Sequence, residues 1–136
     1  MTRYLLDSGI ASDSINGRGL VPSRVKAARL AGHRIGLGTP VLGELIAGIQ
    51  RSSDPPRHLA ALWRNVGKLT LWTFDKAAAI EFGRLQGELL GPGRKMQVPD
   101  IQIAAIALSL GNAIVVSKDS DLRAVPGLSV EDWSLS

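Results

Sequence analysis

Short apolar segments alternate with longer segments that have the residue spacing of helices, and this alternation runs along most of the chain. The segments expected to form strands are Tyr4–Leu6, Ile35–Gly38, Leu69–Trp72, Ala113–Val116 and a last short one near Leu128–Trp133. Strands that are joined by helices pair in parallel, and the helices then cover both faces of the sheet. The sequence therefore predicts an α/β fold with a central parallel sheet, formed by residues 1–136 as a single domain.

The expected helices are bounded by residues that commonly begin or end helices. Thr39 and Pro40 are expected to be the N-cap and the first residue of a helix that continues through Ile49. Further helices are expected over Pro22–Ala31, from Pro55 to about Val66, from Lys76 to about Leu90 behind an Asp75 cap, and over Pro99–Leu110. Residues 8–20 contain Ser, Gly and Asn and are expected to form a helical turn or a loop.

The composition limits the metal chemistry open to this chain. It has no cysteine, which excludes disulfides, thiolate zinc sites and cysteine nucleophiles. Its two histidines, His33 and His58, lack the spacing of metal ligands and are expected at the surface. Any bound metal would therefore be held by oxygen atoms, which favours Mg²⁺ or Mn²⁺ over zinc.

The net charge of +4, from 16 Lys and Arg against 12 Asp and Glu, suits a nucleic-acid partner without establishing one. If several of the acids surround a metal, the remaining surface is more basic still. Basic residues attract phosphate, and acids hold the metal that activates its attack. A basic surface around an acidic centre is therefore the arrangement that a nuclease needs.

Neither a membrane span nor a signal peptide is visible in the sequence. No uninterrupted apolar stretch approaches the roughly 20 residues that a transmembrane helix needs. The N-terminal apolar run is short and meets an acid at Asp7, which is unlike a secretory signal. We therefore expect a cytoplasmic protein.

Two acids follow expected strands. Asp7 ends the first apolar segment, and Asp119 comes three residues after Val116. In an open parallel α/β sheet, ligands bind beyond the carboxyl ends of the strands. Both acids are therefore candidate site residues, although acids also begin many loops that have no function.

Two further acids interrupt apolar faces of expected helices. Glu44 shares a face with Val41, Leu45, Gly48 and Ile49, and Asp100 shares one with Ile103, Ala104, Ala107 and Leu108. A buried carboxylate is normally paired, protonated or bound to a metal. The alternatives are that Asp100 is a helix N-cap and that Glu44 forms a salt bridge with Arg51 or another arginine.

Four carboxylates that converge in one cleft repel each other. Two unit charges about 4 Å apart interact by roughly 4 kcal/mol at an effective dielectric constant near 20. Such a cluster takes up protons or binds a divalent cation. A water molecule activated by that cation can attack phosphorus while the cation stabilises the developing charge.

At these positions the sequence resembles the PIN-domain family, and in particular the VapC-type toxins of bacterial toxin–antitoxin pairs. The matching segments are Tyr4-Leu5-Leu6-Asp7-Ser8-Gly9, Gly43-Glu44-Leu45 with Gly48, Asp100-Ile101-Gln102-Ile103-Ala104-Ala105, Val115-Val116-Ser117-Lys118-Asp119 with Asp121, and a tail from Val125 to Trp133. No single motif is specific, but the set covers nearly the whole chain in the family's order and spacing.

The resemblance implies a three-layer α/β/α PIN-like fold and a metal-dependent endoribonuclease that uses Mg²⁺ or Mn²⁺. It also implies a homodimer and an antitoxin that blocks the active site. By matching position, the metal-binding and catalytic residues would be Asp7, Glu44, Asp100 and Asp119, supported by the polar residues Ser8, Ser117 and Asp121. Ser8 would replace the family's threonine, whose hydroxyl hydrogen-bonds the acidic cluster.

One departure from the family pattern leaves a second interpretation open. Gly9 stands where the family usually has asparagine, so one supporting polar group is missing. The alternative function is therefore a weakly active or inactive PIN domain that binds RNA or an antitoxin. Arg94 and Lys95, just before Asp100, are candidates for contacting RNA phosphates.

A response-regulator receiver also places acids at strand ends beside a serine and a lysine. It needs an acidic pair after the first strand, whereas this chain has Asp7-Ser8. It also needs an acid at the end of a central strand, whereas Glu44 is expected on a helix. The pattern therefore disfavours a receiver.

Overall fold

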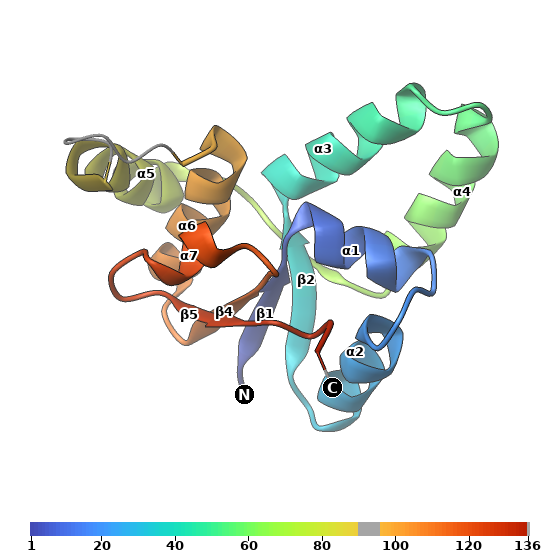
Figure 1. Ribbon diagram of the computed structural model, residues 1–136, viewed down its shortest axis with the longest axis horizontal. Coiled ribbons are helices and arrows are strands. Elements are labelled where there is room, and N and C mark those ends of the chain that lie inside the picture. Colours follow the sequence, from blue (N-terminus) through green and yellow to red (C-terminus); the bar gives the residue numbers. More distant parts are fainter. Residues whose placement is uncertain (90–95, 136) are drawn as a thin grey trace.

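A computed structural model describes residues 1–89 and 96–135, and five strands in this part form one sheet between layers of helices (Figure 1). The strands are β1 (Arg3–Leu6), β2 (Arg34–Gly38), β3 (Thr70–Trp72), β4 (Ala113–Val116) and β5 (Ser129–Glu131). Their order in the sheet is β3-β2-β1-β4-β5, and every neighbouring pair is parallel. The predicted parallel α/β fold is confirmed.

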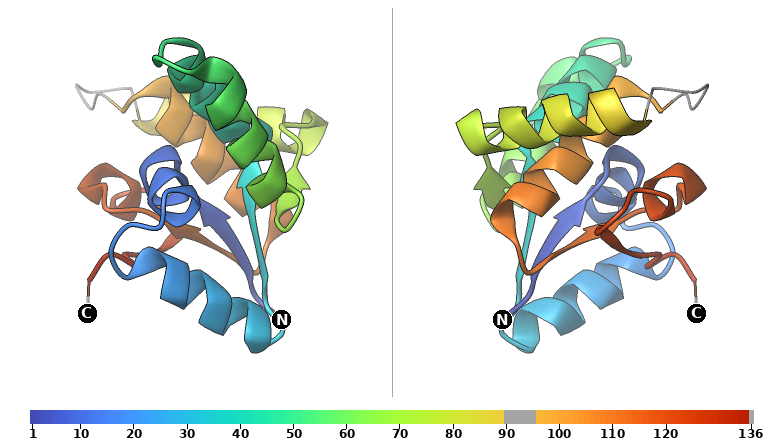
Figure 2. Two further views of the ribbon diagram at one scale, coloured as in Figure 1. Left: turned by 90° about the vertical axis from the view of Figure 1, so that its right-hand side faces the viewer. Right: turned by 90° about the vertical axis from the view of Figure 1, so that its left-hand side faces the viewer.

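The helices lie on both faces of the sheet. Their bounds are α1 (Ser8–Ile15), α2 (Val21–Leu30), α3 (Thr39–Gln50), α4 (Pro55–Val66), α5 (Lys76–Leu89), α6 (Val98–Leu110) and α7 (Ser120–Arg123). Figures 1 and 2 show α5 and α6 on one side and α1 and α2 on the other, with α3 beyond the carboxyl end of β2. The three-layer arrangement is therefore also confirmed.

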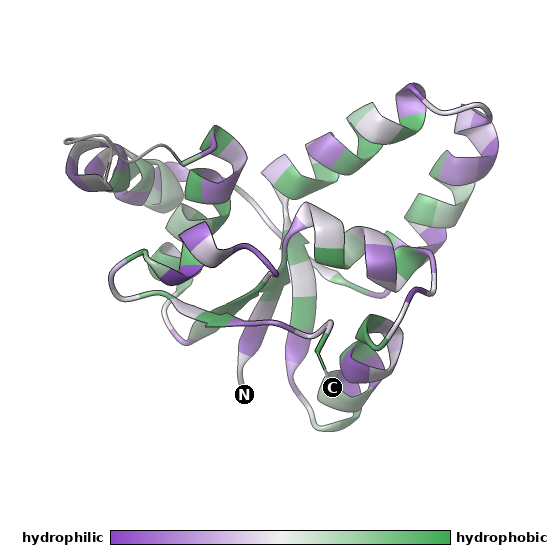
Figure 3. Ribbon diagram, in the orientation of Figure 1, coloured by the Kyte–Doolittle hydropathy of each residue, from purple (hydrophilic) through white to green (hydrophobic). Residues whose placement is uncertain are grey.

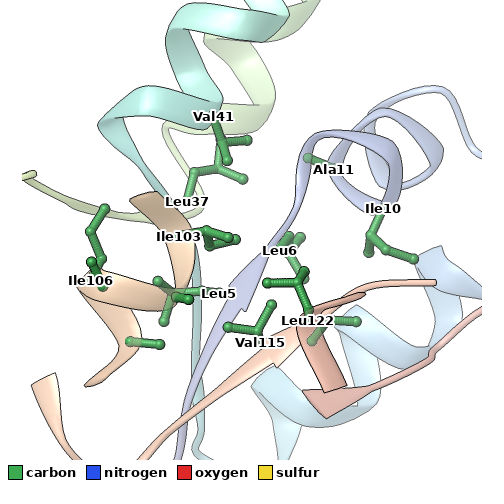
Figure 4. Close-up of a cluster of buried hydrophobic side chains, with 14 of the residues drawn as sticks. Leu5, Leu6, Ile10, Ala11, Leu37, Val41, Ile103, Ile106, Val115 and Leu122 are labelled. Atoms are coloured by element: carbon green, nitrogen blue, oxygen red, sulfur yellow. The ribbon is translucent and has the colours of Figure 1, made fainter. Parts of the chain in front are cut away.

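The core lies where the central strand β1 meets α6. Leu5 and Leu6 of β1 are fully buried, and the buried residues of α6 are Ile101, Ile103, Ala104, Ala105, Ile106 and Ala107. Figure 4 shows Ile103 between the β1 leucines and Leu37 of β2. Figure 3 shows apolar residues along the middle of β1 and β2 and a mixture of polar and apolar residues on the outer helices. This packing lays α6 along the sheet, with Asp100 near the carboxyl ends of β1 and β4 and Leu110 beside Arg3 at the start of β1.

A close approach of backbones explains one glycine in β2. A Cβ atom on Gly36 would lie 1.9 Å from the carbonyl oxygen of Thr70 in β3. No side chain fits in that space, so only glycine allows the two strands to pair at this point.

Three local predictions were wrong or incomplete. Residues 8–20 contain the eight-residue helix α1, not merely a turn or loop. The N-cap of α3 is Gly38, and Thr39 is the first helical residue. The Thr39 hydroxyl instead accepts a hydrogen bond from the backbone N–H of Phe74 at 3.1 Å. The short helix α7, which Asp119 caps, was not anticipated.

In the part of the chain that the structure describes, every helix is too short or too polar to cross a membrane.

Candidate active site

The four predicted acids meet at the carboxyl edge of the sheet. Asp7 follows β1 and caps α1, while Asp119 follows β4 and caps α7. Because β1 and β4 are parallel neighbours, their carboxyl ends bring these two acids together. Glu44 lies on α3 and Asp100 in the first turn of α6, and the charges of all four acids act on one another.

Asp7 is held from two directions. Its Oδ1 accepts a hydrogen bond from the backbone N–H of Ile10 at 2.8 Å, and its Oδ2 accepts one from the Ser117 hydroxyl at 2.5 Å. Burial raises the pKa of the Asp7 carboxyl; the two hydrogen bonds lower this pKa, and the charge of Asp119 raises it further. Asp7 is therefore a fixed and partly desolvated carboxylate.

Ser117 connects the ends of the two central strands. Its side chain is fully buried, and its hydroxyl also accepts a hydrogen bond from the backbone N–H of Asp119 at 2.9 Å. The Ser8 hydroxyl, by contrast, makes no hydrogen bond with any described residue. The hydroxyl contact to the acidic cluster that the resemblance assigned to Ser8 is thus made by Ser117. Asp121 contributes its backbone N–H, which donates to Asp119 Oδ1 at 2.9 Å.

Asp100 interacts most strongly with Asp119 among the other acids. Burial, a side-chain hydrogen bond to Asp119 and the negative charges of the other acids together raise the pKa of Asp100 to about 7. The alternative that Asp100 is a helix N-cap is wrong, because α6 is capped by Gln97 and Asp100 is its third residue. Asp100 is therefore available to the site and is protonated over much of the acidic pH range.

Glu44 differs from its expected environment. Its side chain is exposed, because the face of α3 that carries it is turned towards a hollow instead of the core. Among the described residues it has no ion pair, so the salt bridge to Arg51 is not observed there. Partial burial and the charge of Asp7 raise the pKa of Glu44, which places it within electrostatic reach of the cluster.

The chemistry of the donor set fits a divalent cation such as Mg²⁺ or Mn²⁺. All four groups supply carboxylate oxygens, and burial together with the other acids raises the pKa of Asp100, a repulsion that a bound cation would relieve. Within residues 1–89 and 96–135, no three acidic or histidine side chains are close enough to hold an ion as they stand. Metal binding would therefore require the four side chains to move closer together.

A hollow of about 390 Å³ adjoins the cluster between α1, α3 and α4. Its lining includes Glu44 and Arg18 together with the apolar side chains of Leu45, Ile49 and Leu62. Of the four acids, Glu44 is the one that lines this hollow, which is large enough for part of an extended polymer.

Ser117→Ala is expected to destabilise the fold and to impair the site. The substitution leaves a buried backbone N–H at Asp119 and an oxygen of Asp7 without partners, at a cost of roughly 1–3 kcal/mol. Urea unfolding should show this loss, and Ser120→Ala, at an exposed position in the same segment, should change stability by less than about 0.5 kcal/mol. Equal stability of the two variants would mean that Ser117 does not support the cluster.

The structure gives Gly9 no backbone role. It is exposed in the first turn of α1 and has ordinary helical geometry, and a Cβ atom there would meet only Asp7 Oδ1, at 3.7 Å. A side chain such as asparagine would fit, so the missing polar group is a difference in chemistry and not a steric requirement.

The predicted RNA-binding candidates, Arg94 and Lys95, lie outside the residues that the structure describes. His33 is partly buried beside Tyr4 and accepts a hydrogen bond from the backbone N–H of Thr2, and His58 lines the hollow. Lys118, which sequence reasoning did not single out as functional, lies between Ser117 and Asp119 and pairs with Asp13 of α1 at 3.2 Å. The signal that could have identified Lys118 is its position between Ser117 and Asp119 in a segment that matches the family.

The family model of the PIN domain matches residues 4–128, which is most of the chain. The chain belongs to the PIN-domain family. The family that the matching sequence segments indicated is thereby confirmed.

Named relatives and solved structures of similar length agree with this assignment. The PIN domain is 32% identical over 135 residues to a tRNA(fMet)-specific endonuclease VapC of Shigella flexneri, covering 98% of this chain and 100% of the relative. It resembles the DNA-bound VapBC of Salmonella typhimurium with a TM-score of 0.88 and 29% identity, covering 98% and 99% of the two chains. A VapBC2 structure from Rickettsia felis, at 23% identity and a TM-score of 0.89 over 97% and 99%, shows the same fold.

Proposed function

We propose that this PIN domain is a metal-dependent endoribonuclease of the VapC type, which hydrolyses phosphodiester bonds in RNA. The observation that carries the proposal is the group of four interacting carboxylates at the carboxyl edge of the sheet. The ribonuclease names of full-length relatives support the same chemistry. A cation bound there would supply Lewis-acid activation of water and stabilisation of phosphate charge.

The chain's own residues have distinct parts in this proposal. Asp7, fixed by Ser117, and the Asp100–Asp119 pair would hold Mg²⁺ or Mn²⁺. Glu44, exposed at the edge of the hollow, would complete the set from α3. Asp100 takes up or releases a proton near neutral pH, because its pKa is about 7.

An antitoxin protein is the proposed regulatory partner. Structures of similar fold include members of the VapBC family of toxin–antitoxin systems, and those from Rickettsia felis and Salmonella typhimurium are bound to DNA. An antitoxin that covers the carboxylate edge would prevent access of RNA. We also propose that the toxin forms a homodimer; the exposed apolar side chains Ile80 of α5 and Val98 of α6 are available for such an interface.

Cleavage of RNA by the purified chain tests the proposed function. Added Mg²⁺ or Mn²⁺ is expected to support cleavage, and a chelator is expected to abolish it, because the site is made only of carboxylates and cannot polarise phosphate without a cation. Calcium, which tolerates irregular ligand geometry, serves as a control for simple charge screening.

Two results would contradict the ribonuclease proposal. Cleavage that persists unchanged in chelator would exclude a metal-dependent mechanism. Absence of cleavage with either metal, combined with retained binding to RNA or an antitoxin, would favour the alternative of an inactive binding module, for which Gly9 would be the first residue to examine.

A further inference from the structure

Next to the four carboxylates, one recessed acid lies between two exposed cations. Asp13 of α1 pairs through Oδ2 with the Lys118 Nζ at 3.2 Å and through Oδ1 with the Arg18 Nη1 at 3.8 Å. The Asp13 side chain is 16% exposed, whereas those of Lys118 and Arg18 are 57% and 64% exposed. This cation pair, defined by Lys118 and Arg18, therefore presents a net positive charge to solvent.

Lys118 is tied to the acidic cluster by its neighbours in the chain. The preceding residue, Ser117, donates to Asp7, and the backbone N–H of the following residue, Asp119, donates to Ser117. The charge of Lys118 reaches Asp7, where it opposes the burial that raises the pKa of that carboxyl. Lys118 thus extends from the rim of the candidate active site.

Arg18, the second member of the cation pair, lies at the hollow. It lines the space between α1, α3 and α4, and Glu44 of the acidic cluster lines that space too. Among the residues that line this hollow, Arg18 is the one with a permanent positive charge. A chain of phosphates that enters the hollow and reaches the carboxylates therefore passes close to the cation pair.

Lys118 and Arg18 are both more than half exposed, so each can contact a second anion while it stays paired with Asp13. Lysine and arginine are the usual donors to the phosphate oxygens of nucleic acids. Positive charge at this place also offsets the repulsion between RNA and the four acids. We propose that Lys118 and Arg18 bind a backbone phosphate of RNA next to the bond that is cut, and that Asp13 positions both cations.

This inference rests on the proposed ribonuclease function, and RNA binding without cleavage tests it separately. In an Asp100→Asn background, Lys118→Met is expected to weaken binding of a short, fluorescently labelled single-stranded RNA about fivefold at low salt. The slope of log K against log salt concentration should fall by about 0.7, because one phosphate contact is lost. Lys118→Arg should retain both the RNA affinity and the salt slope.

Lys26→Met is the matched control, because Lys26 is an exposed lysine on α2, which Figure 1 shows away from α3. It should leave the affinity and the salt slope unchanged. Unchanged RNA affinity and slope for Lys118→Met would overturn the phosphate contact. Loss of cleavage with unchanged RNA binding would overturn it as well, since Lys118 would then act through Asp7.

Asp13→Asn tests the positioning role in the chain that still carries Asp100. Both cations remain, so RNA affinity should be equal or higher, while kcat should fall about tenfold because the cations are no longer oriented. An unchanged kcat would overturn the role of Asp13. If the unmodified chain cleaves no RNA but binds it in a Lys118-dependent way, the ribonuclease function fails and the phosphate site stands.

Discussion

Asp7→Asn is expected to lower the rate of RNA cleavage by about 10³-fold while leaving the fold intact. Asparagine is as good a helix N-cap as aspartate, so the hydrogen bond from the Ile10 N–H can be kept. What is lost is a negative charge that is desolvated and aimed at the acidic cluster. The measurement is the single-turnover cleavage rate with saturating Mn²⁺, together with a thermal unfolding curve.

Asp75→Asn is a closely matched control for this experiment. Asp75 also caps a helix, since it accepts a hydrogen bond from the backbone N–H of Ala78 at 2.9 Å, but it belongs to α5 and is exposed. It should change neither cleavage nor stability appreciably. A similar loss of activity in both variants would attribute the effect to helix capping and would remove Asp7 from the catalytic group.

Asp100→Asn is expected to stabilise the metal-free protein at pH 8 and to have a clearly smaller effect at pH 5. The folded protein holds the Asp100 proton up to about pH 7, whereas the unfolded chain releases it near pH 4. Between these values the folded state binds more protons, so the stability of the unmodified chain falls as the pH rises. Asparagine is neutral throughout, can donate the same hydrogen bond to Asp119 and does not incur this loss.

Because Asp100 is partly exposed, solvent screening reduces the expected gain at pH 8 to about 1–2 kcal/mol. Urea unfolding in chelator at both pH values measures it. In the same variant, Mg²⁺ or Mn²⁺ should no longer raise the melting temperature, because a ligand is gone. A lower stability at pH 8 with undiminished metal stabilisation would identify Asp100 as a purely structural residue.

The parts of the site that could be predicted are those that local sequence determines. Asp7 and Asp119 were placed by the apolar runs that precede them, because such runs form strands and parallel strands end at a common edge. Asp100 was found as an acid on an otherwise apolar face of a helix, and the structure buries Ile103, Ala104 and Ala107 of that face. The motif set also indicated the family, because several weak matches in a fixed order are jointly specific.

Other features depended on contacts between distant residues. The sequence suggested that Glu44 was buried, but α3 leaves the sheet at an angle that turns Glu44 towards the hollow. Thr39 was assigned to a cap, but it hydrogen-bonds the segment after β3. The hydroxyl that holds Asp7 comes from Ser117, which is 110 residues away along the chain.

The sequence by itself determined the alternation of strands and helices, the parallel sheet and the identity of the four acids, because periodicity and residue type act over a few residues. Only the tertiary structure decided how strongly the acids interact, which serine supports them and where Lys118 lies. Those properties depend on burial, hydrogen bonding and Coulomb interaction between side chains from different elements. Packing of β1, β4, α3 and α6 brings these elements together, and no local pattern encodes the resulting distances.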